Sequence, residues 1–332
     1  MKFLVIRFSS IGDIVLASPV FRCLKNQVAT AEIHLLTKHS FKAVTEANPY
    51  IDKFYYLERS IDDVIHSLLN EDYDYVIDLH NNFRSQKIRR ALKKPTQVID
   101  KLNWQKFLLT NLHVNFMPRR HITTRSLDTV GVFGVNDDGK GLDYFIPEKD
   151  RIRDEDLPTS HHAGYIAIVI GASYLTKKLP VYKLKQLCST IQYPIVLVGG
   201  KEDAEEGQAV SSVDSSKIYN ACGKFNLNES ADIVRRSNLV ISHDTGLQYI
   251  ACAFGKKVLA LWGSTSPKLD VEPYYGSALA NDEPGGRYEN IFLDLPCQPC
   301  SKFGNKKCPR GHFKCMREQN IEVIAEKALA RL

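Results

Sequence analysis

Short runs of aliphatic and β-branched residues alternate with amphipathic stretches along most of the chain, and this alternation restricts the fold more than any other feature. Continuous apolar strands separated by helices are typical of parallel sheets that helices cover on both faces. The pattern therefore predicts two doubly wound α/β domains. The expected strands lie at 3–6, 32–36, 54–57, 75–79 and 97–99 in the first half, and at 165–170, 195–198, 217–219, 239–242 and 257–261 in the second.

The boundary between the two domains is expected in the segment 147–164, which is charged, contains two prolines and has no apolar period. A chain of 332 residues is about twice the usual domain size, which agrees with two domains. We assign residues 1–155 to an N-terminal domain and residues 156–316 to a C-terminal domain. In the remaining segment, 317–332, Asn320 is placed to cap a final helix.

Composition and charge exclude several classes of protein. With 44% hydrophobic and 25% charged residues the chain is ordinary for a globular protein. A net charge of +6 is too small for a typical nucleic-acid binder, and the chain has no nucleic-acid motif, although it would suit anionic ligands or a membrane surface. No apolar run reaches the roughly 18 to 20 residues that span a bilayer. Because Arg7 and Asp13 interrupt the apolar N-terminus, we expect a buried first strand and a cytoplasmic protein.

The turn after the first expected strand carries the first candidate site residues. It reads Arg7-Phe8-Ser9-Ser10-Ile11-Gly12-Asp13. Gly12 allows the backbone to approach a ligand closely, and Asp13 would stand at the start of the next helix. The alternative is that Asp13 only stabilises the N-terminus of that helix.

Two turns in the second half have the chemistry of a phosphate site. Asp244, Thr245 and Gly246 follow a strand and precede a helix, so that unpaired N–H groups and a hydroxyl face outward. Another small-residue turn, 171–173, is followed by Lys177 and Lys178. Ligands bind at the carboxyl ends of parallel strands, so these turns and the first one predict a nucleotide diphosphate in a cleft between the domains.

Taken in order, these motifs resemble glycosyltransferase family 9, the ADP-heptose:lipopolysaccharide heptosyltransferases. The resemblance rests on residues 9–13, 171–173 with 177–180, 244–247 with 251–253, and 78–80 with 84–85, in sequence from residue 1 to about 316. It implies a GT-B fold, in which two Rossmann-like domains face a cleft and the C-terminal helix packs back towards the N-terminal domain. It also implies inverting transfer of a heptose from ADP-heptose to a lipopolysaccharide core acceptor. That reaction requires no cofactor and would take place at the cytoplasmic face of the inner membrane.

The resemblance also implies roles for individual residues. Asp13 matches the general base, Glu202 matches a carboxylate that contacts the ribose of the donor, and Asp244 lies beside the sugar. The positions that match the diphosphate site are Ser173, Lys177, Thr245, Gly246 and Leu247. This chain has Leu179 and Tyr249 where the family usually has tryptophan and histidine. These departures leave two alternatives open: a transferase or epimerase for another nucleotide sugar, such as a UDP-sugar, and a nucleotide-binding protein without turnover.

The acceptor side is expected to be basic, because lipopolysaccharide cores are dense in carboxylates and phosphates. Ser10 and Gly12 are assigned to this side, together with Arg84 and the basic group 119–125 that includes Arg120. The alternative for these cations is a solvated helix face.

Four cysteines are crowded into a short segment near the C-terminus. They are Cys297, Cys300, Cys308 and Cys315, with His312 among them. The spacing is close to that of a structural zinc site that would brace the loop before the final helix. Reduced thiols without a ligand, disulfides and another metal are the alternatives.

Overall fold

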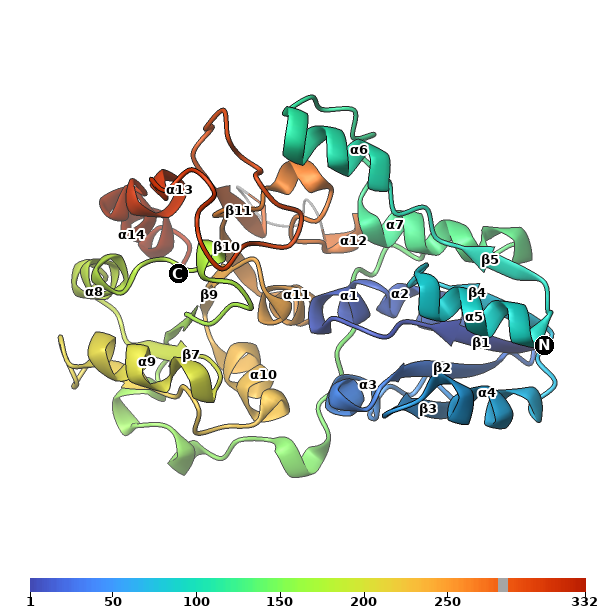
Figure 1. The fold of residues 1–332 in the computed structure, drawn as a ribbon. Helices are drawn as coiled ribbons and strands as arrows, with labels where there is room; N and C mark the ends of the chain where they lie inside the picture. Colours follow the sequence, from blue (N-terminus) through green and yellow to red (C-terminus); the bar gives the residue numbers. More distant parts are fainter. Residues whose placement is uncertain (280–285) are drawn as a thin grey trace.

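The computed structural model describes residues 1–279 and 286–332 and contains two sheets in which every strand pairing is parallel. All ten expected strands are present, and an eleventh, β11, was not predicted. The first sheet has the order β3-β2-β1-β4-β5, and the second has the order β11-β10-β9-β6-β7-β8 (Figure 1). The strands are β1 (Lys2–Ile6), β2 (Glu32–Lys38), β3 (Lys53–Leu57), β4 (Tyr75–Asp78), β5 (Thr96–Val98), β6 (Ile166–Val169), β7 (Ile195–Val198), β8 (Ile218–Asn220), β9 (Leu239–His243), β10 (Lys257–Leu261) and β11 (Tyr288–Ile291).

Helices connect successive strands, as parallel pairing requires. They are α1 (Ile11–Leu16), α2 (Ser18–Gln27), α3 (Lys42–Thr45), α4 (Ile61–Leu69), α5 (Phe83–Leu92), α6 (Asn103–Phe107), α7 (Ile122–Leu127), α8 (Val181–Thr190), α9 (Ala204–Ser211), α10 (Leu227–Arg236), α11 (Gly246–Ala253), α12 (Gly276–Leu279), α13 (Lys314–Arg317) and α14 (Ile321–Leu329). The connecting segment 147–164 forms only short 3₁₀ turns. In the described residues, no helix is long and apolar enough to cross a membrane.

The apolar core is continuous from one sheet to the other. One cluster of buried residues includes Val5 of β1, Val169 of β6, Val240 of β9 and Tyr249 of α11. A separate cluster lies on the other face of each sheet. The sheets therefore form two lobes in Figure 1, but the helices between them bury a common core.

The final helix packs differently from the expectation. Asn320 caps α14 by accepting a hydrogen bond from the Val323 N–H at 3.2 Å, as predicted. The apolar face of α14, which includes Ile321 and Ile324, belongs to the core of the second sheet and packs against α8. The expected packing towards the N-terminal domain is therefore wrong, because this face is already buried within the second lobe.

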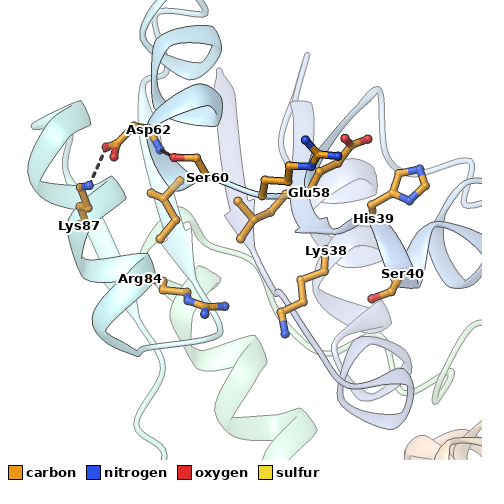
Figure 2. A pocket seen from close by; sticks show the side chains of 11 residues that line it. Lys38, His39, Ser40, Glu58, Ser60, Asp62, Arg84 and Lys87 are labelled. Atoms are coloured by element: carbon orange, nitrogen blue, oxygen red, sulfur yellow. Dashed lines mark hydrogen bonds and ion pairs between the residues drawn. The ribbon is translucent and has the colours of Figure 1, made fainter.

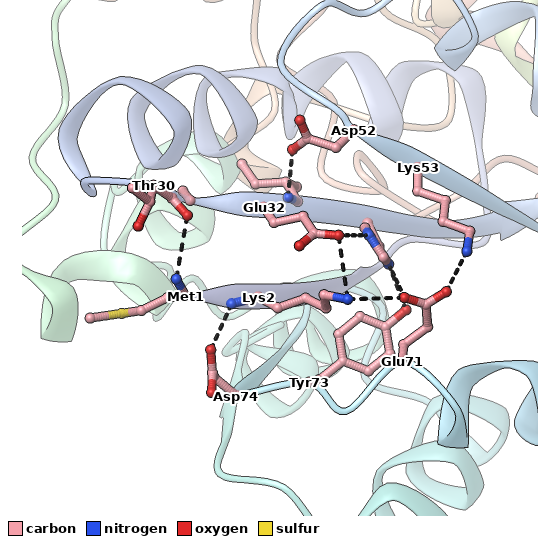
Figure 3. A network of polar contacts seen from close by, with 12 residues as sticks. Met1, Lys2, Thr30, Glu32, Asp52, Lys53, Glu71, Tyr73 and Asp74 are labelled. Atoms are coloured by element: carbon pink, nitrogen blue, oxygen red, sulfur yellow. Dashed lines mark hydrogen bonds and ion pairs between the residues drawn. The ribbon is translucent and has the colours of Figure 1, made fainter.

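A polar network closes the amino end of the first sheet (Figure 3). The carboxylate of Glu71 accepts hydrogen bonds from Lys53, from Tyr55 and, at 3.1 Å, from Lys2. His34 lies between Tyr73 and Glu32, with ring nitrogens 3.0 Å and 2.8 Å from their oxygens. Lysine ammonium groups neutralise the carboxylates of this network. Its hydrogen bonds link β1, β2 and β3 to the loop after α4.

Candidate active site

The N-termini of α1 and α11 meet where the two lobes touch (Figure 1). The contact needs two glycines. A Cβ on Gly12 would lie 2.7 Å from Cδ2 of Tyr249, and a Cβ on Gly246 would lie 2.5 Å from Cγ2 of Ile11. Only the absence of these side chains lets the helices approach so closely. The turns that the sequence placed after the first strand and after β9 are thus brought together.

Asp13 lies in the first turn of α1 and is held from two directions. One carboxylate oxygen pairs with Arg7 at 2.7 Å, and the other accepts hydrogen bonds from the N–H and the hydroxyl of Ser10 at 3.1 Å and 2.8 Å. Burial opposes ionisation, but Arg7 and Ser10 outweigh it and hold the pKa of Asp13 below its usual value. The carboxylate is therefore an anion at neutral pH, and it remains partly exposed.

Sequence reasoning missed the surroundings of Asp13. Arg7 is nearly buried and also donates to the carbonyl of Leu79, at the end of β4. His80 packs edge-on against Phe8, and burial together with the charges of Arg7 and Lys101 lowers its pKa to about 3. Its imidazole is therefore neutral at pH 7. The cluster therefore places the anionic carboxylate of Asp13 near a neutral imidazole.

The donor-side residues form a second cluster across the contact. Lys177 pairs with Asp244 at 2.7 Å, and both side chains are mostly buried. The Tyr249 hydroxyl donates to Asp244 at 3.3 Å and to the carbonyl of Val271 at 2.7 Å. Since the ring of Tyr249 also lies against Gly12, it connects this cluster to the turn that carries Asp13. Thr245, Gly246 and Leu247 begin α11 beside the same pair.

Two further donor-side candidates lie at strand ends of the second sheet. Ser173 is exposed in the turn after β6, and Glu202 is exposed in the turn after β7. Between these turns is Asp203, a residue that sequence reasoning missed. Its carboxylate accepts from the Gly200 N–H at 2.9 Å and pairs with Lys178 at 2.8 Å. Lys178 therefore organises the loops, whereas Lys177 lies beside Asp244.

The two departures from the family pattern have structural explanations. Leu179 is buried in the core of the second sheet, and its N–H donates to Nε2 of His243 at 2.8 Å. Burial lowers the pKa of His243 to about 3, so the ring stays neutral and accepts this bond. Tyr249 supports Asp244, as described above. Leu179 is thus a core residue rather than a wall of the cleft.

A hollow of about 900 Å³ lies at the carboxyl edge of the first sheet, beside the ends of β2 and β3. Lys38 and Arg84 point into it from different elements (Figure 2). Lys87 also lines it and pairs with Asp62 at 2.6 Å. The hollow combines cations with a few carboxylates, and Arg84 lies where an anionic group could bind.

The basic group 119–125 is not a single site. Arg120 is half-exposed and pairs with Asp128 at 2.6 Å. Arg125 is buried and donates to the carbonyls of Arg120 and Asp100 at 3.1 Å and 2.7 Å. His121 caps α7 and lies 3.0 Å from the carbonyl oxygen of Glu272 in the second lobe. His121 therefore links the two lobes and Arg125 braces the first lobe, whereas Arg119 and Arg120 are exposed.

The cysteine segment is adjacent to the donor-side cluster. The Asn305 carbonyl accepts from the Thr176 N–H, the Asn305 N–H donates to the Thr176 hydroxyl oxygen, and Gly304 lies against the methylenes of Lys177. All eight cysteines are free thiols, and Sγ of Cys297 is 3.7 Å from Nε2 of His312. Burial raises the pKa of Cys315 to about 12, and the three neighbouring thiols act in the same direction.

The four thiols are not drawn together as closely as a metal would hold them. In residues 1–279 and 286–332, the one group of three or more His, Cys, Asp or Glu side chains with ligand atoms all within 4.8 Å is Glu32, His34 and Glu71. That group is the lysine-neutralised network of Figure 3.

Comparison with known proteins identifies the family. The model of glycosyltransferase family 9 (heptosyltransferase) matches residues 61–308. The chain belongs to this family. Among curated relatives of this family 9 enzyme, lipopolysaccharide heptosyltransferase 1 of Campylobacter coli is 27% identical over 291 residues, covering 80% of this chain and 84% of the relative. Lipooligosaccharide heptosyltransferase 2 of Haemophilus influenzae is 24% identical over 301 residues, covering 81% and 85%.

A solved structure confirms the fold of this glycosyltransferase. The ADP-heptose lipopolysaccharide heptosyltransferase II of Escherichia coli superposes with a TM-score of 0.72 at 18% identity, covering 99% of this chain and 98% of that one. The predicted GT-B architecture and the predicted family are therefore both confirmed.

Proposed function

We propose that this enzyme transfers a heptose from ADP-heptose to a lipopolysaccharide core acceptor with inversion, and that Asp13 is the general base. The proposal rests on one observation at the contact between the lobes. The ring of Tyr249 lies against Gly12 in the turn that carries Asp13, and its hydroxyl donates to Asp244, the partner of Lys177. Heptosyl transfer agrees with the names of the curated relatives.

The reaction follows from the chemistry of these residues. An acceptor hydroxyl attacks the anomeric carbon, the bond from that carbon to the diphosphate oxygen breaks, and Asp13 takes the hydroxyl proton. The ADP that leaves gains negative charge. The ammonium of Lys177 has three donors and can serve both Asp244 and a phosphate oxygen. The N–H groups at the start of α11 stabilise the same charge.

Binding of the two substrates is assigned to opposite lobes. On the donor side, Ser173 and Glu202 lie at the ends of β6 and β7, where the diphosphate and ribose would lie. On the acceptor side, Arg84 points into the hollow of the first lobe and would pair with acidic groups of the core sugar. Arg120, Ser10 and Gly12 are assigned to the same side. The lipid part of such an acceptor implies peripheral contact with the cytoplasmic face of the inner membrane.

The role of Asp13 is tested by Asp13→Asn. The amide cannot accept the proton, so we expect kcat to fall by roughly 10² to 10⁴-fold. The affinity for ADP, measured by calorimetry, should change little, since Asp13 lies outside the donor cluster. Glu326→Gln, which changes an exposed carboxylate on α14, is the matched control and should keep full activity. Retained turnover in Asp13→Asn would contradict the assignment of Asp13 as the general base.

The donor is tested separately. Thermal-shift measurements with ADP, UDP, GDP and CMP should show the largest stabilisation with ADP, and preference for UDP would favour the alternative donor class. Lys177→Ala should weaken ADP binding by about tenfold, because a charge-assisted hydrogen bond to phosphate is lost. An unchanged ADP affinity would contradict the placement of Lys177.

The cysteine segment is proposed as structural rather than catalytic, with zinc held by Cys297, Cys300, Cys308 and Cys315. Four thiolates suit a tetrahedral zinc, and closing the site would fix Gly304 and Asn305 against the lysine motif. Elemental analysis of protein purified without added metal should find about one zinc per chain. Substoichiometric metal would leave the hydrogen bonds between Asn305 and Thr176 as the support of this loop.

A further inference from the structure

The segment 103–116, which we call the α6 segment, is apolar on both of its faces. Its inner face is accounted for: Leu109, together with Leu102 and Met117 at the two ends of the segment, is buried against Leu269 of the second lobe. Its outer face is not covered by any other part of the described chain. The exposed fractions there are 67% for Trp104, 49% for Phe107, 59% for Leu112 and 64% for Phe116.

These exposed residues are grouped in one segment and are not scattered singly over the surface. Trp104 and Phe107 stack with ring centroids 5.8 Å apart, and Leu112, Val114 and Phe116 follow within one short segment. In Figure 1, α6 stands at the upper edge of the molecule, away from both sheets. Exposed apolar patches of this kind mark sites that contact a protein or a membrane.

The charge around the α6 segment favours one of these partners. From Lys101 to Leu127 the sequence contains no aspartate or glutamate, and it contains no acidic residue between 295 and 317, where six lysines and arginines occur. Lys302 of the second stretch lies near enough to Lys101 and Lys106 for their charges to interact. Burial and the charges of neighbouring cations, Lys302 among them, lower the pKa of Lys106 to about 8. Phe303 is exposed as well, with the Lys302 ammonium 5.2 Å from its ring.

Lysines are depleted from the centres of protein interfaces, whereas aromatic residues beside lysines are typical of segments that lie at a bilayer surface. We propose that the α6 segment and the adjoining loop 302–310 form a docking surface for a lipid bilayer with anionic head groups. The inference rests on the proposed function in one respect: an enzyme whose acceptor is anchored in a bilayer by its lipid needs a surface that binds the bilayer.

The position of the surface relative to the site supports this assignment. The inner face of the α6 segment packs against Leu269 and Val271, and the Val271 carbonyl accepts the hydrogen bond of Tyr249. Tyr249 in turn lies between the Asp13 turn and Asp244. An acceptor held in the bilayer by its lipid would therefore meet the enzyme one layer of side chains from the reaction centre.

Trp104 supplies a direct readout. The other tryptophan, Trp262, is fully buried and donates to Asn290 at 2.8 Å, so a change in emission on binding reports on Trp104. Vesicles of phosphatidylethanolamine and phosphatidylglycerol, without donor or acceptor, should shift the emission to shorter wavelength. Brominated lipid should quench it, and salt should weaken the effect. Unchanged emission with these vesicles would overturn the proposal.

A double variant, Trp104→Ser with Phe107→Ser, tests the surface independently. We expect co-sedimentation with the same vesicles to fall by roughly tenfold or more, because both apolar anchors are lost. Tyr182→Ser is the matched control, since Tyr182 is also an exposed aromatic beside lysines but lies on α8 of the second lobe. It should leave vesicle binding unchanged. Equal losses in both variants would contradict a localised surface.

Activity separates this inference from the proposed function. The double variant should transfer heptose normally to a water-soluble, deacylated acceptor and lose activity on acceptor embedded in vesicles. If neither acceptor is used by the wild-type enzyme, the proposed function fails while the vesicle results still decide the docking surface. A dimer in ultracentrifugation that the double variant abolishes, without vesicle binding by either protein, would assign the patch to a second copy and overturn the proposal.

Discussion

Arg7 connects the candidate base to the sheet beneath it. Its guanidinium pairs with Asp13 at 2.7 Å and donates to the Leu79 carbonyl, so one side chain joins α1 to the end of β4. Without this cation, burial would dominate and the pKa of Asp13 would rise.

Arg7→Met should therefore move the acidic limb of the pH profile of kcat/KM upward. We expect a shift of about 1–2 pH units, which is typical when an opposite charge is removed from a carboxylate. Activity near pH 5 is then lost first, while activity at higher pH is retained. Arg7→Lys keeps the positive charge, so the acidic limb of its kcat/KM profile should lie close to that of the wild-type enzyme. An unmoved limb in a folded Arg7→Met enzyme would show that Arg7 does not tune the base.

Glu71 is the residue whose ionisation holds the amino end of the first sheet. Hydrogen bonds from Lys53 and Tyr55 lower its pKa to about 2. A carboxyl with a lowered pKa adds stability above its unfolded pKa, near 4.3, and that contribution is lost as the pH falls towards the folded value. Glu71→Gln should cost about 1–2 kcal/mol at pH 7 and progressively less between about pH 4 and pH 2. Urea unfolding at several pH values measures this, and a loss that does not depend on pH would contradict the account.

Individual site residues differed in how readily the sequence revealed them. Asp13 and Asp244 each follow a strand and lie next to a glycine-containing turn, a local pattern that can be recognised in one dimension. Arg7 belongs to the same turn, but its role could not be found in this way, because its backbone partner, Leu79, is 72 residues away. Asp203 was missed for the same reason, since its role depends on Lys178 in a different loop.

The contact between α1 and α11 is the element on which the site depends. Gly246→Ala would place a Cβ 2.5 Å from Ile11 Cγ2 and force the two helices apart. We expect a loss of about 1–3 kcal/mol in stability. We also expect a fall in kcat of roughly 10²-fold, because a shift of about 1 Å separates the reacting groups.

Gly131→Ala is the control for that experiment. A Cβ at Gly131 meets no heavy atom within 4 Å, so the substitution tests the loss of a glycine without a clash. It should leave activity unchanged and stability equal or slightly higher. Thermal unfolding and steady-state kinetics of the two variants can be compared directly. Equal behaviour would mean that the helix contact tolerates an extra methyl group.

Strands were predicted more reliably than packing. Seven of the ten predicted strands, β1, β2, β4, β6, β7, β9 and β10, are mostly buried, and apolar runs of this kind stand out in a sequence. β11 reads Tyr-Glu-Asn-Ile, is only partly buried and lies at the edge of its sheet, so it carries no comparable signal. The apolar face of α14 showed that this helix would be buried. Helical periodicity contains no information about which lobe would bury it.

At the scale of the whole molecule, the common core predicts how the enzyme unfolds. The sequence predicted two domains, but residues of both sheets belong to one buried cluster. Differential scanning calorimetry should therefore show one cooperative transition, which ADP moves as a unit to higher temperature. Two transitions, of which ADP moves only one, would show that the lobes unfold independently. Pattern analysis could not foresee the shared core, because it depends on side chains that meet only after both sheets have formed.

The glycine contact between α1 and α11 has a consequence for recombining members of this family. Gly12 belongs to the half that carries the candidate base, and Gly246 belongs to the half that carries the donor cluster, yet each fits only against its counterpart's helix. A chimaera that joins the first lobe of one relative to the second lobe of another must therefore inherit Ile11, Gly12, Gly246 and Tyr249 as a matched set. Without that set, the two parents would each contribute an intact half and still fail to make one working enzyme.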